Sequence, residues 1–330
     1  MKGKTKRKIL DFLRQNLKAR PHDLTNQIGI SPQALHRHLK QLQEQNQIEK
    51  FGKPPHVFYK LLGIKSEVLN INISVEAKEL LADKYLYATP TGEFKTGQAG
   101  FADWASRTNQ NTNLSLLAEE YLAVRKKADK FFIKNKSWID ASERFKSIFD
   151  SLALKKIFYL DFYSLPKFGK TRLGTLVLHG KQAQSKKIIS NLGFEASKTI
   201  NQIIKENKID AYGLIPHSLP RELQFLKEFN KNLEINLPQV ILRKAYPGEV
   251  PVAQKSLSKL SERIENAKSS IFVESVKVPY KKILLIDDAI GSGATLNETA
   301  KKLLTHEAVK EVYGFALVGS YKGFEVIKEV

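Results

Sequence analysis

Two adjacent carboxylates, Asp287 and Asp288, stand shortly before a turn, residues 291–295, that contains two glycines and two hydroxyl side chains. The glycines permit a positive φ and a close backbone approach to a ligand, and the hydroxyls can donate hydrogen bonds to phosphate oxygens. A phosphate would repel the carboxylates, so we expect them to serve a neighbouring group, either sugar hydroxyls or a hydrated Mg²⁺. This combination fits a sugar that carries a 5-phosphate.

The flanking residues predict the elements that position this turn. Residues 283–286 are four consecutive branched apolar residues bounded by charge, which is typical of a strand buried on both faces. Residues 296–304 predict a helix, and a strand-to-helix turn presents backbone N–H groups and the positive end of a helix dipole to a phosphate. The plainer alternative is an acidic strand end followed by a polar turn, but the ordered combination favours a binding site.

Residues 283–296 resemble the phosphoribosyl pyrophosphate (PRPP) signature of type I phosphoribosyltransferases: four hydrophobic residues, two acids, two intervening residues and a Thr-Thr-Gly-X-Thr-like loop. The chain has Gly291 and Ser292 where the family often has two threonines, so only one of those hydroxyls is kept. The resemblance implies PRPP as ligand, Mg²⁺ as its cofactor, and a catalytic role for Asp287 and Asp288. The PRPP-binding residues that it implies are Asp287, Asp288, Ala289, Ile290, Gly291, Ser292, Gly293, Ala294 and Thr295.

Length and composition limit the number of domains and the classes of protein to which the chain can belong. A chain of 330 residues with 42% hydrophobic content is long enough for two or three domains with real cores. The sequence has no cysteine, which excludes disulfides and cysteine-ligated zinc. No stretch approaches the length of a membrane span, and the first residues run into an amphipathic helix rather than a signal-peptide core. We therefore expect a cytoplasmic protein without a membrane partner.

The formal net charge of +20 favours a polyanionic partner, with nucleic acid ahead of a membrane surface. The charge is concentrated at the amino terminus, where residues 1–63 contain thirteen lysines and arginines against four acids. For the rest of the chain, a generally basic solubilising surface remains an open alternative.

Residues 1–63 predict a small helical domain. Apolar spacing indicates helices at 5–17, 21–28 and 32–45, and two short strands at 48–51 and 57–61. Ser31 is suited to cap the third helix, and Pro32 to occupy its first position, where a missing N–H costs nothing.

This order of elements resembles a winged helix-turn-helix DNA-binding domain, with residues 31–40 as its recognition helix and double-stranded DNA as the implied partner. The amino-terminal part of such a helix enters the major groove. The candidate DNA-binding residues are Gln33, His36 and Arg37 for base edges, and Ser31, Lys40 and Lys53 for phosphates. A dimerisation or protein-contact module is the alternative. His36 and His38 are two apart on a helix and point in different directions, which argues against a metal site.

Residues 64–155 predict a helical connector to which no chemistry is assigned. Helices are expected at 66–87, 114–132 and 142–154, with a polar, glycine-rich passage at 89–100.

From residue 156 to 330 the pattern alternates between strands and helices. Strands are expected at 157–162, 174–178, 209–215, 240–242, 283–286 and 312–318, and helices at 186–205, 221–229, 257–267 and 296–304. Such alternation predicts an α/β fold, a mostly parallel sheet with flanking helices, in which ligands bind beyond the carboxyl ends of the strands.

Within residues 156–320, ordered landmarks resemble the competence-associated ComF-type subfamily of phosphoribosyltransferases. They are Leu214 to His217, Phe229 and Asn230, Arg243, Gln254, Leu257, Arg263, Asn266, Ala267 and Phe272. The resemblance implies a pyrophosphate-binding loop at 216–219 and a loop at 246–253 that closes over the site. The implied pyrophosphate-binding residues are Pro216, His217, Ser218 and Arg243. The resemblance also suggests Arg263, and it leaves nucleic acid open as the ligand of Arg243 and Arg263. Arg263 paired with a neighbouring glutamate is the alternative.

Together these features predict a DNA-binding protein with a PRPP-binding, phosphoribosyltransferase-like domain. Bacterial purine-operon repressors are similar in plan, which implies a ligand-responsive transcriptional regulator, whereas the ComF resemblance implies DNA uptake. The alternative is a catalytically active, Mg²⁺-dependent phosphoribosyltransferase of unknown acceptor, and the sequence leaves enzymatic activity open. A homodimer is one expected assembly.

Overall fold

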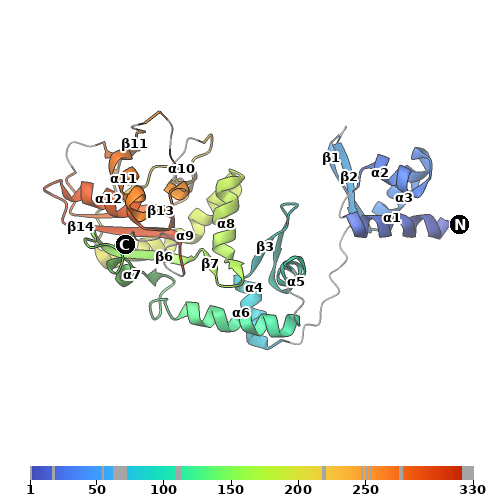
Figure 1. The fold of residues 1–330 in the computed structure, drawn as a ribbon, viewed down its shortest axis with the longest axis horizontal. Helices are drawn as coiled ribbons and strands as arrows, with labels where there is room; N and C mark the ends of the chain where they lie inside the picture. Colours follow the sequence, from blue (N-terminus) through green and yellow to red (C-terminus); the bar gives the residue numbers. More distant parts are fainter. Residues whose placement is uncertain are drawn as a thin grey trace. The chain divides into compact units, whose positions relative to one another are not determined.

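The computed structural model describes residues 2–16, 19–53, 56–61, 73–108, 113–217, 221–246, 248–249, 252, 254–274 and 278–321. The chain divides into two compact units, Met1–Ile71 and Asn72–Val330, which are described separately (Figure 1).

The first unit consists of three helices and a hairpin. Its elements are α1 (Lys2–Asn16), α2 (Pro21–Ile28), α3 (Pro32–Glu44), β1 (Ile48–Lys53) and β2 (His56–Leu61). Ser31 caps α3 by accepting a hydrogen bond from the Ala34 amide at 3.2 Å, and Pro32 occupies the first helical position. The strands pair antiparallel, and the core is formed by Ile9, Leu13, Ala19, Leu24, Leu35, Leu39, Leu42, Ile48 and Tyr59. The predicted helices and both strands are confirmed.

The second unit is built on a six-stranded sheet in the order β10-β9-β13-β14-β6-β5. Its elements are β5 (Ile139–Asp140), β6 (Leu154–Phe162), β9 (Ala211–Leu214), β10 (Gln239–Val240), β13 (Lys282–Ile290) and β14 (Glu311–Gly319). All neighbouring pairs are parallel except β5 with β6. A mostly parallel sheet is therefore confirmed, with β13 between β9 and β14.

Strand β13 supplies side chains to both faces of the sheet. Ile283 and Leu285 belong to one apolar cluster, and Leu284 and Ile286 belong to the other. Successive side chains of a strand point to opposite faces of the sheet, and both faces are covered. All four residues are therefore fully buried, as the apolar run predicted.

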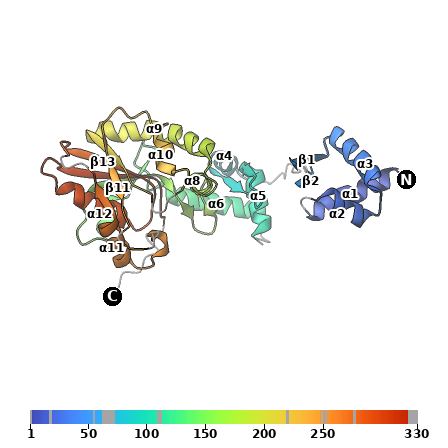
Figure 2. The same cartoon turned by 90° about the horizontal axis from the view of Figure 1, so that it is seen from above.

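Helices cover both faces, as the views in Figures 1 and 2 show. On the Leu284 side lie α8 (Arg172–Gln182), α9 (Lys186–Asn207) and α10 (Phe225–Asn230). On the Leu285 side lie α7 (Ser142–Lys146), α11 (Leu260–Ser270) and α12 (Ala294–Leu304). A small antiparallel pair, β11 (Leu242–Lys244) with β12 (Ile271–Val273), stands beside the sheet.

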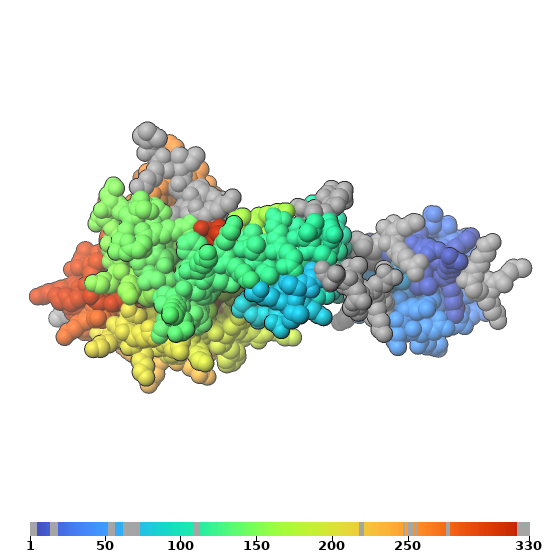
Figure 3. Space-filling view, turned by 90° about the horizontal axis from the view of Figure 1, so that it is seen from below, coloured from blue at the N-terminus to red at the C-terminus, as the bar shows by residue number. Residues whose placement is uncertain are grey.

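Residues 73–155 belong to the same core as the sheet. This segment contains α4 (Val75–Lys84), β3 (Leu86–Ala88), β4 (Phe94–Thr96), α5 (Gly97–Arg107) and α6 (Leu114–Asp129). Phe101 and Tyr121 share one apolar cluster with Leu154 and Leu285. In Figure 3 the cyan-to-green surface of this segment adjoins the yellow surface of the sheet-covering helices. The predicted three-part division stays a prediction, but the packing groups residues 73–155 with the sheet.

One predicted strand is wrong. Residues 174–178 lie inside α8, because tertiary contacts override the local strand preference of the Leu-Val-Leu run. Thr171 accepts a hydrogen bond from the Gly174 amide at 3.0 Å and donates one to the Phe162 carbonyl at 2.6 Å. A Cβ on Gly174 would lie 2.0 Å from the Tyr163 carbonyl oxygen, so only glycine lets α8 start against the end of β6.

Smaller differences concern element ends. The helix predicted at 142–154 is only the short α7, since β6 already begins at Leu154. The passage predicted as polar at 89–100 contains β4 and the start of α5. The first part of the helix predicted at 66–87 lies outside the described residues. No helix in the described parts of the chain is long and apolar enough to span a membrane.

Candidate ligand pocket and nucleic-acid interface

A cavity of about 1240 Å³ lies at the carboxyl ends of β9 and β13. Its lining includes every predicted PRPP-binding residue except Ala294, which is buried as the first residue of α12. The walls also take residues from α8, α10 and β11. The cavity therefore stands where parallel sheets place their ligands.

The two carboxylates come from one strand, because β13 continues through Asp287 and Asp288 to Ile290. Asp288 is 6% exposed, and its amide donates a hydrogen bond to Asp287 Oδ1 at 2.8 Å. Burial, followed by the neighbouring charge of Asp288, raises the pKa of the Asp287 carboxyl to about 8, although Lys181 opposes this rise. Two adjacent acids in a partly desolvated wall are thus hard to ionise together.

Lys181, near the end of α8, is the direct partner of Asp288, since its Nζ donates a hydrogen bond to Asp288 Oδ2. Burial lowers the pKa of Lys181, but the charge and hydrogen bond of Asp288, with a contribution from Asp287, outweigh this and raise it. Arg221 donates a hydrogen bond to the Lys181 carbonyl and so fastens the end of α8 to the pocket wall.

The glycine turn follows at once and opens α12. Gly293 has a φ of +77° and stands at the N-cap, where a Cβ would lie 2.4 Å from Phe145 Cε1 of α7. Ser292 is buried, and its Oγ accepts a weak hydrogen bond from the Ala294 amide at 3.4 Å. The first amides of a helix have no intrahelical partners, so this end of α12 presents N–H groups and a positive dipole end to the cavity.

Asn297 fixes the first turn of α12 to the chain that leads into β6. It is fully buried, and its Oδ1 accepts a hydrogen bond from the Ala153 amide at 2.8 Å. Its Nδ2 donates to the Ser151 carbonyl at 3.4 Å. The phosphate-binding turn predicted from the sequence therefore rests on residues 145–153.

Gln254 and Arg263 line the cavity beside the glycine turn. Gln254 Nε2 donates hydrogen bonds to Thr295 Oγ1 at 3.2 Å and to the Arg263 carbonyl at 2.9 Å. Arg263 Nε donates to the Leu257 carbonyl at 2.9 Å, and its Nη1 lies 3.6 Å from the position of a Cβ on Gly291. Burial lowers the pKa of Arg263. Its guanidinium thus lies beside the glycine turn, as a phosphate ligand requires.

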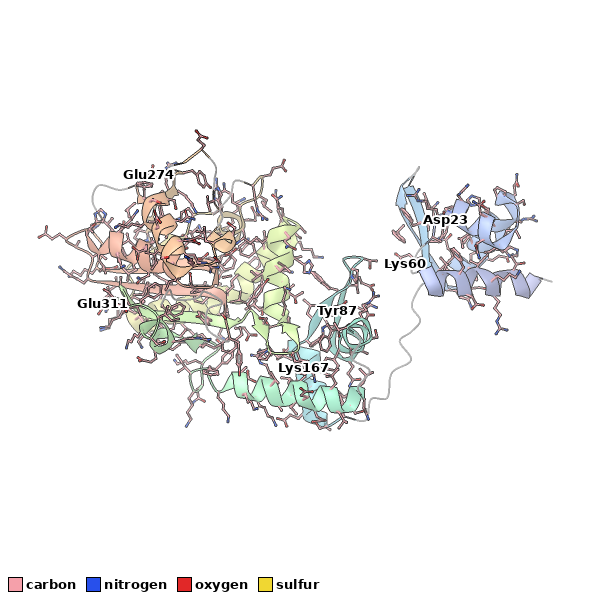
Figure 4. The ribbon with its side chains drawn as sticks, viewed as in Figure 1. Asp23, Lys60, Tyr87, Lys167, Glu274 and Glu311 are labelled. Atoms are coloured by element: carbon pink, nitrogen blue, oxygen red, sulfur yellow. The ribbon has the colours of Figure 1, made fainter. Side chains whose placement is uncertain are left out.

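The predicted pyrophosphate-binding residues lie on the β9 side. Pro216 and His217 follow β9 and line the cavity, whereas Ser218 lies outside the described residues. Burial and the charge of Lys244 lower the pKa of His217. Arg243 also lines the cavity, but its side chain is 70% exposed and binds Glu274 Oε1 at 2.6 Å (Glu274 is labelled in Figure 4). The predicted closing loop, residues 246–253, is only partly within the described residues.

The lining is strongly cationic. Among the described residues, seven lysines and arginines line the cavity, against the two aspartates: Lys181, Arg221, Lys227, Lys231, Arg243, Lys244 and Arg263. Sequence reasoning missed Lys181, because residues 174–178 were assigned to a strand, and it also missed Arg221 and Lys244. The only available signal was their basic character near predicted strand ends. The excess of positive charge suits a ligand with several phosphate charges.

The described residues do not form a metal site by themselves. No group of three or more histidine, aspartate or glutamate side chains in the described ranges could hold a metal ion. The two carboxylates are oxygen ligands of the kind that Mg²⁺ prefers, but Asp288 Oδ2 already binds the Lys181 ammonium. The Mg²⁺ expected from the resemblance stays a prediction.

The first unit presents a polar face of α3. Leu35, Leu39 and Leu42 are buried on one side of the helix, and Gln33, His36, Arg37 and Lys40 are exposed at helical spacing on the other. Ser31 is exposed at the N-cap. The backbone of Lys53 ends β1, and its side chain lies outside the described residues.

The hairpin adds an aromatic surface that the sequence reasoning missed. The rings of Phe51 and Phe58 stack at 5.7 Å across the strands. Lys60, labelled in Figure 4, lies over Phe51 at 5.7 Å, and Arg20 lies over Phe58 at 5.2 Å. Cations held over aromatic rings beside α3 extend the basic surface.

Comparison with known proteins gives a family match for the first unit. Residues 3–49 match the family described as winged helix-turn-helix DNA-binding, so the first unit is a winged helix-turn-helix DNA-binding domain. Among solved structures, the Zalpha domain of Carassius auratus PKZ in complex with Z-DNA is 36% identical, over 18% of this chain and 94% of that chain, with a TM-score of 0.17.

Other similar structures include phosphoribosyltransferases at low identity. A hypoxanthine phosphoribosyltransferase from Staphylococcus aureus is 14% identical over 44% of this chain and 71% of its own, with a TM-score of 0.26. A hypoxanthine-guanine phosphoribosyltransferase from Bacillus anthracis is 14% identical over 44% and 73%, with a TM-score of 0.27. The comparison with curated proteins found no match.

Proposed function

We propose that this winged helix-turn-helix protein binds a phosphorylated ribose, with PRPP as the leading candidate, in the cavity of its second unit. One observation carries the proposal: two carboxylates and a glycine turn at a helix N-terminus share a cavity with seven lysines and arginines. The carboxylates suit ribose hydroxyls, and the cations suit phosphates.

Each part of such a ligand has a matching wall. The 5-phosphate would accept hydrogen bonds from the amides that open α12 and from the hydroxyls of Ser292 and Thr295. The ribose hydroxyls would donate to Asp287 and Asp288. The pyrophosphate would lie toward His217 and Arg243, on the β9 side of the cavity. The ligand is thus held mainly by charge and by backbone groups.

The proposed role is a ligand-responsive regulator of transcription, and a DNA-uptake function is the alternative role. A ligand changes DNA affinity only if it binds the two states of the protein with different affinities. By linkage, DNA must then change the affinity for PRPP by the same factor.

Isothermal titration of the full chain with PRPP, with and without duplex DNA at a fixed salt concentration, tests the proposal. We expect saturable binding that DNA shifts, and a loss of binding in Asp288→Asn but not in Asp83→Asn, an exposed control outside the cavity. Absence of PRPP binding would remove the proposal. Binding without any effect of DNA would leave the ligand but remove the regulatory role.

A working phosphoribosyltransferase is the second candidate, favoured by the size of the cavity. Its volume of about 1240 Å³ exceeds the roughly 300–1,000 Å³ of ordinary small-molecule sites, which leaves room for an acceptor beside PRPP. Release of pyrophosphate in the presence of a nucleobase, lost in Asp288→Asn, would support this candidate. No release across a broad panel of acceptors would reject it.

A further inference from the structure

Lys181 is the partner of Asp288, one of the two acids for which a hydrated Mg²⁺ was one expected partner. Its ammonium donates a hydrogen bond to Asp288 Oδ2, and Asp288 is itself buried. The two residues are 107 positions apart in the sequence, so α8 and β13 are brought together by the fold to form this pair.

The position of Lys181 is fixed by its surroundings. The Lys181 carbonyl accepts a hydrogen bond from Arg221, and the side chain of Gln184 accepts one from the Leu223 amide at 2.8 Å. Both bonds join the end of α8 to the loop before α10, which also lines the cavity. The lysine side chain is 47% exposed, so it lies at the wall of the cavity and not beneath it.

A second lysine serves the other carboxylate. Lys244 of β11 is half-buried, lines the cavity and lies within electrostatic range of Asp287. Asp288 thus has a hydrogen-bonded cation, whereas Asp287 has only the more distant charge of Lys244 and a pKa that stays raised. A polyphosphate entering this cavity meets an Asp288 carboxylate whose repulsion is already offset.

We propose that Lys181 is a built-in counter-cation for Asp288, which lets the pocket bind a phosphorylated ribose without a divalent metal ion. The inference rests on the proposed function and specifies its cofactor requirement. The ammonium orients the Asp288 carboxylate toward the cavity and supplies one positive charge beside the ligand. Removing it uncovers two adjacent carboxylates, which form an oxygen-rich site for a divalent cation.

The test is isothermal titration of the full chain with PRPP, once with EDTA and once with Mg²⁺. Wild-type protein is expected to bind with similar affinity in both buffers. Lys181→Met is expected to bind at least about tenfold more weakly in EDTA, since a charge-assisted hydrogen bond is lost, and to recover in Mg²⁺. Lys181→Arg keeps the charge and should behave like the wild type.

A second readout does not depend on PRPP. Electron paramagnetic resonance of Mn²⁺ should show no tight site in the wild type and a new site in Lys181→Met. Lys187→Met is the matched control, because Lys187 is an exposed lysine of α9 outside the cavity. Thermal unfolding of each variant shows whether it is folded.

The outcomes separate the two proposals. PRPP binding by the wild type only in Mg²⁺ would overturn the inference and leave the proposed function standing. Unweakened binding of PRPP by Lys181→Met in EDTA would also overturn it. Failure of the wild type to bind PRPP in either buffer would remove the proposed function and the inference together.

Discussion

The two units differ in the exposure and pairing of certain positively charged side chains. In the winged helix-turn-helix domain, Arg37 and Lys40 lie exposed on α3, over a cluster of buried apolar side chains. In the second unit, Arg125 of α6 is 2% exposed and binds Asp161 and Asp129. Charges of the first kind are available to a partner and contribute little to folding, whereas charges of the second kind are structural.

The same contrast applies to the pocket. Lys181 and Asp288 are paired across α8 and β13, so we expect a change in either to affect both the stability of the second unit and the proposed ligand site. Stability and binding are therefore separable in the first unit and coupled in the second. The predictions below test that separation, from the largest expected effect to the smallest.

Arg125→Ala should lower the free energy of unfolding of the second unit by about 3–5 kcal/mol, because it leaves Asp161 buried without its partner. Arg125 Nη1 binds both carboxylate oxygens of Asp161, at 2.9 and 3.0 Å. Urea denaturation followed by tryptophan fluorescence reports this unit alone, since both tryptophans, Trp104 and Trp138, belong to it.

Arg37→Ala is the matched control for that measurement. It should change the free energy of unfolding by less than about 0.5 kcal/mol, as exposed substitutions usually do. A loss of only about 0.5 kcal/mol in Arg125→Ala would show that the buried pair is not structural and would break the contrast between the units.

Gly293→Ala should destabilise the second unit by roughly 2–5 kcal/mol and abolish PRPP binding. The added Cβ meets Phe145 at 2.4 Å, and the left-handed backbone disfavours any side chain. Gly92→Ala is the matched control: its φ is +83°, but nothing lies within 4 Å of a Cβ there. It should cost only about 1–2 kcal/mol. Equal losses in the two variants would mean that the contact with Phe145 has no effect.

Arg37→Ala should weaken binding to duplex DNA by about 1–3 kcal/mol, because the loss of an arginine contact to a base edge has this cost. The affinity for PRPP should not change. Lys40→Met should reduce the slope of log affinity against log salt concentration by about 1, which corresponds to one lost phosphate contact. Lys187→Met should leave this slope unchanged. Fluorescence anisotropy over a range of salt concentrations measures both. Unchanged DNA affinity in Arg37→Ala would show that DNA does not bind through this face of α3.

Asp287→Asn should flatten the pH dependence of stability. The pKa of Asp287 is raised in the folded protein to about 8, above its unfolded value of about 3.9. The folded chain therefore binds this proton more tightly, and the free energy of unfolding falls as the pH rises between those two values.

At pH 8 the asparagine variant should be more stable than the wild type by at least about 1 kcal/mol, since one pKa unit corresponds to about 1.4 kcal/mol. Urea titrations from pH 5 to pH 8 measure the difference, with Asp150→Asn as the control. Parallel curves for the wild type and Asp287→Asn would show that Asp287 ionises normally.

Much of the fold could be predicted from local pattern. The apolar run 283–286 predicted a strand buried on both faces, because no polar residue interrupts it. Ser31 and Pro32 predicted the start of α3 because capping chemistry is local. The exposed face of α3 followed from the spacing of its leucines. The order of acids, glycine turn and helix around Asp288 could be predicted for the same reason, because it depends on residues close in sequence.

What could not be predicted depends on contacts distant in sequence. Residues 174–178 have a local preference for a strand, and only the approach of Gly174 to Tyr163 makes them a helix. Lys181 was missed for that reason, since its partner stands on another element. Gln254 was recognised as a landmark, but its bond to Thr295 is visible only in three dimensions. The role of residues 73–155 in the core is equally a result of packing.

The anchoring of α12 on residues 145–153 determines how long a segment must be transferred by recombination to keep the pocket intact. Phe145 lies beneath Gly293, and the Ala153 amide binds Asn297, so the turn depends on chain that precedes the first parallel strand. A recombination event that transferred only residues 156–321 would separate the turn from its support. The unit of exchange between proteins is therefore longer than the phosphoribosyltransferase-like pattern itself, and includes the helices in front of it.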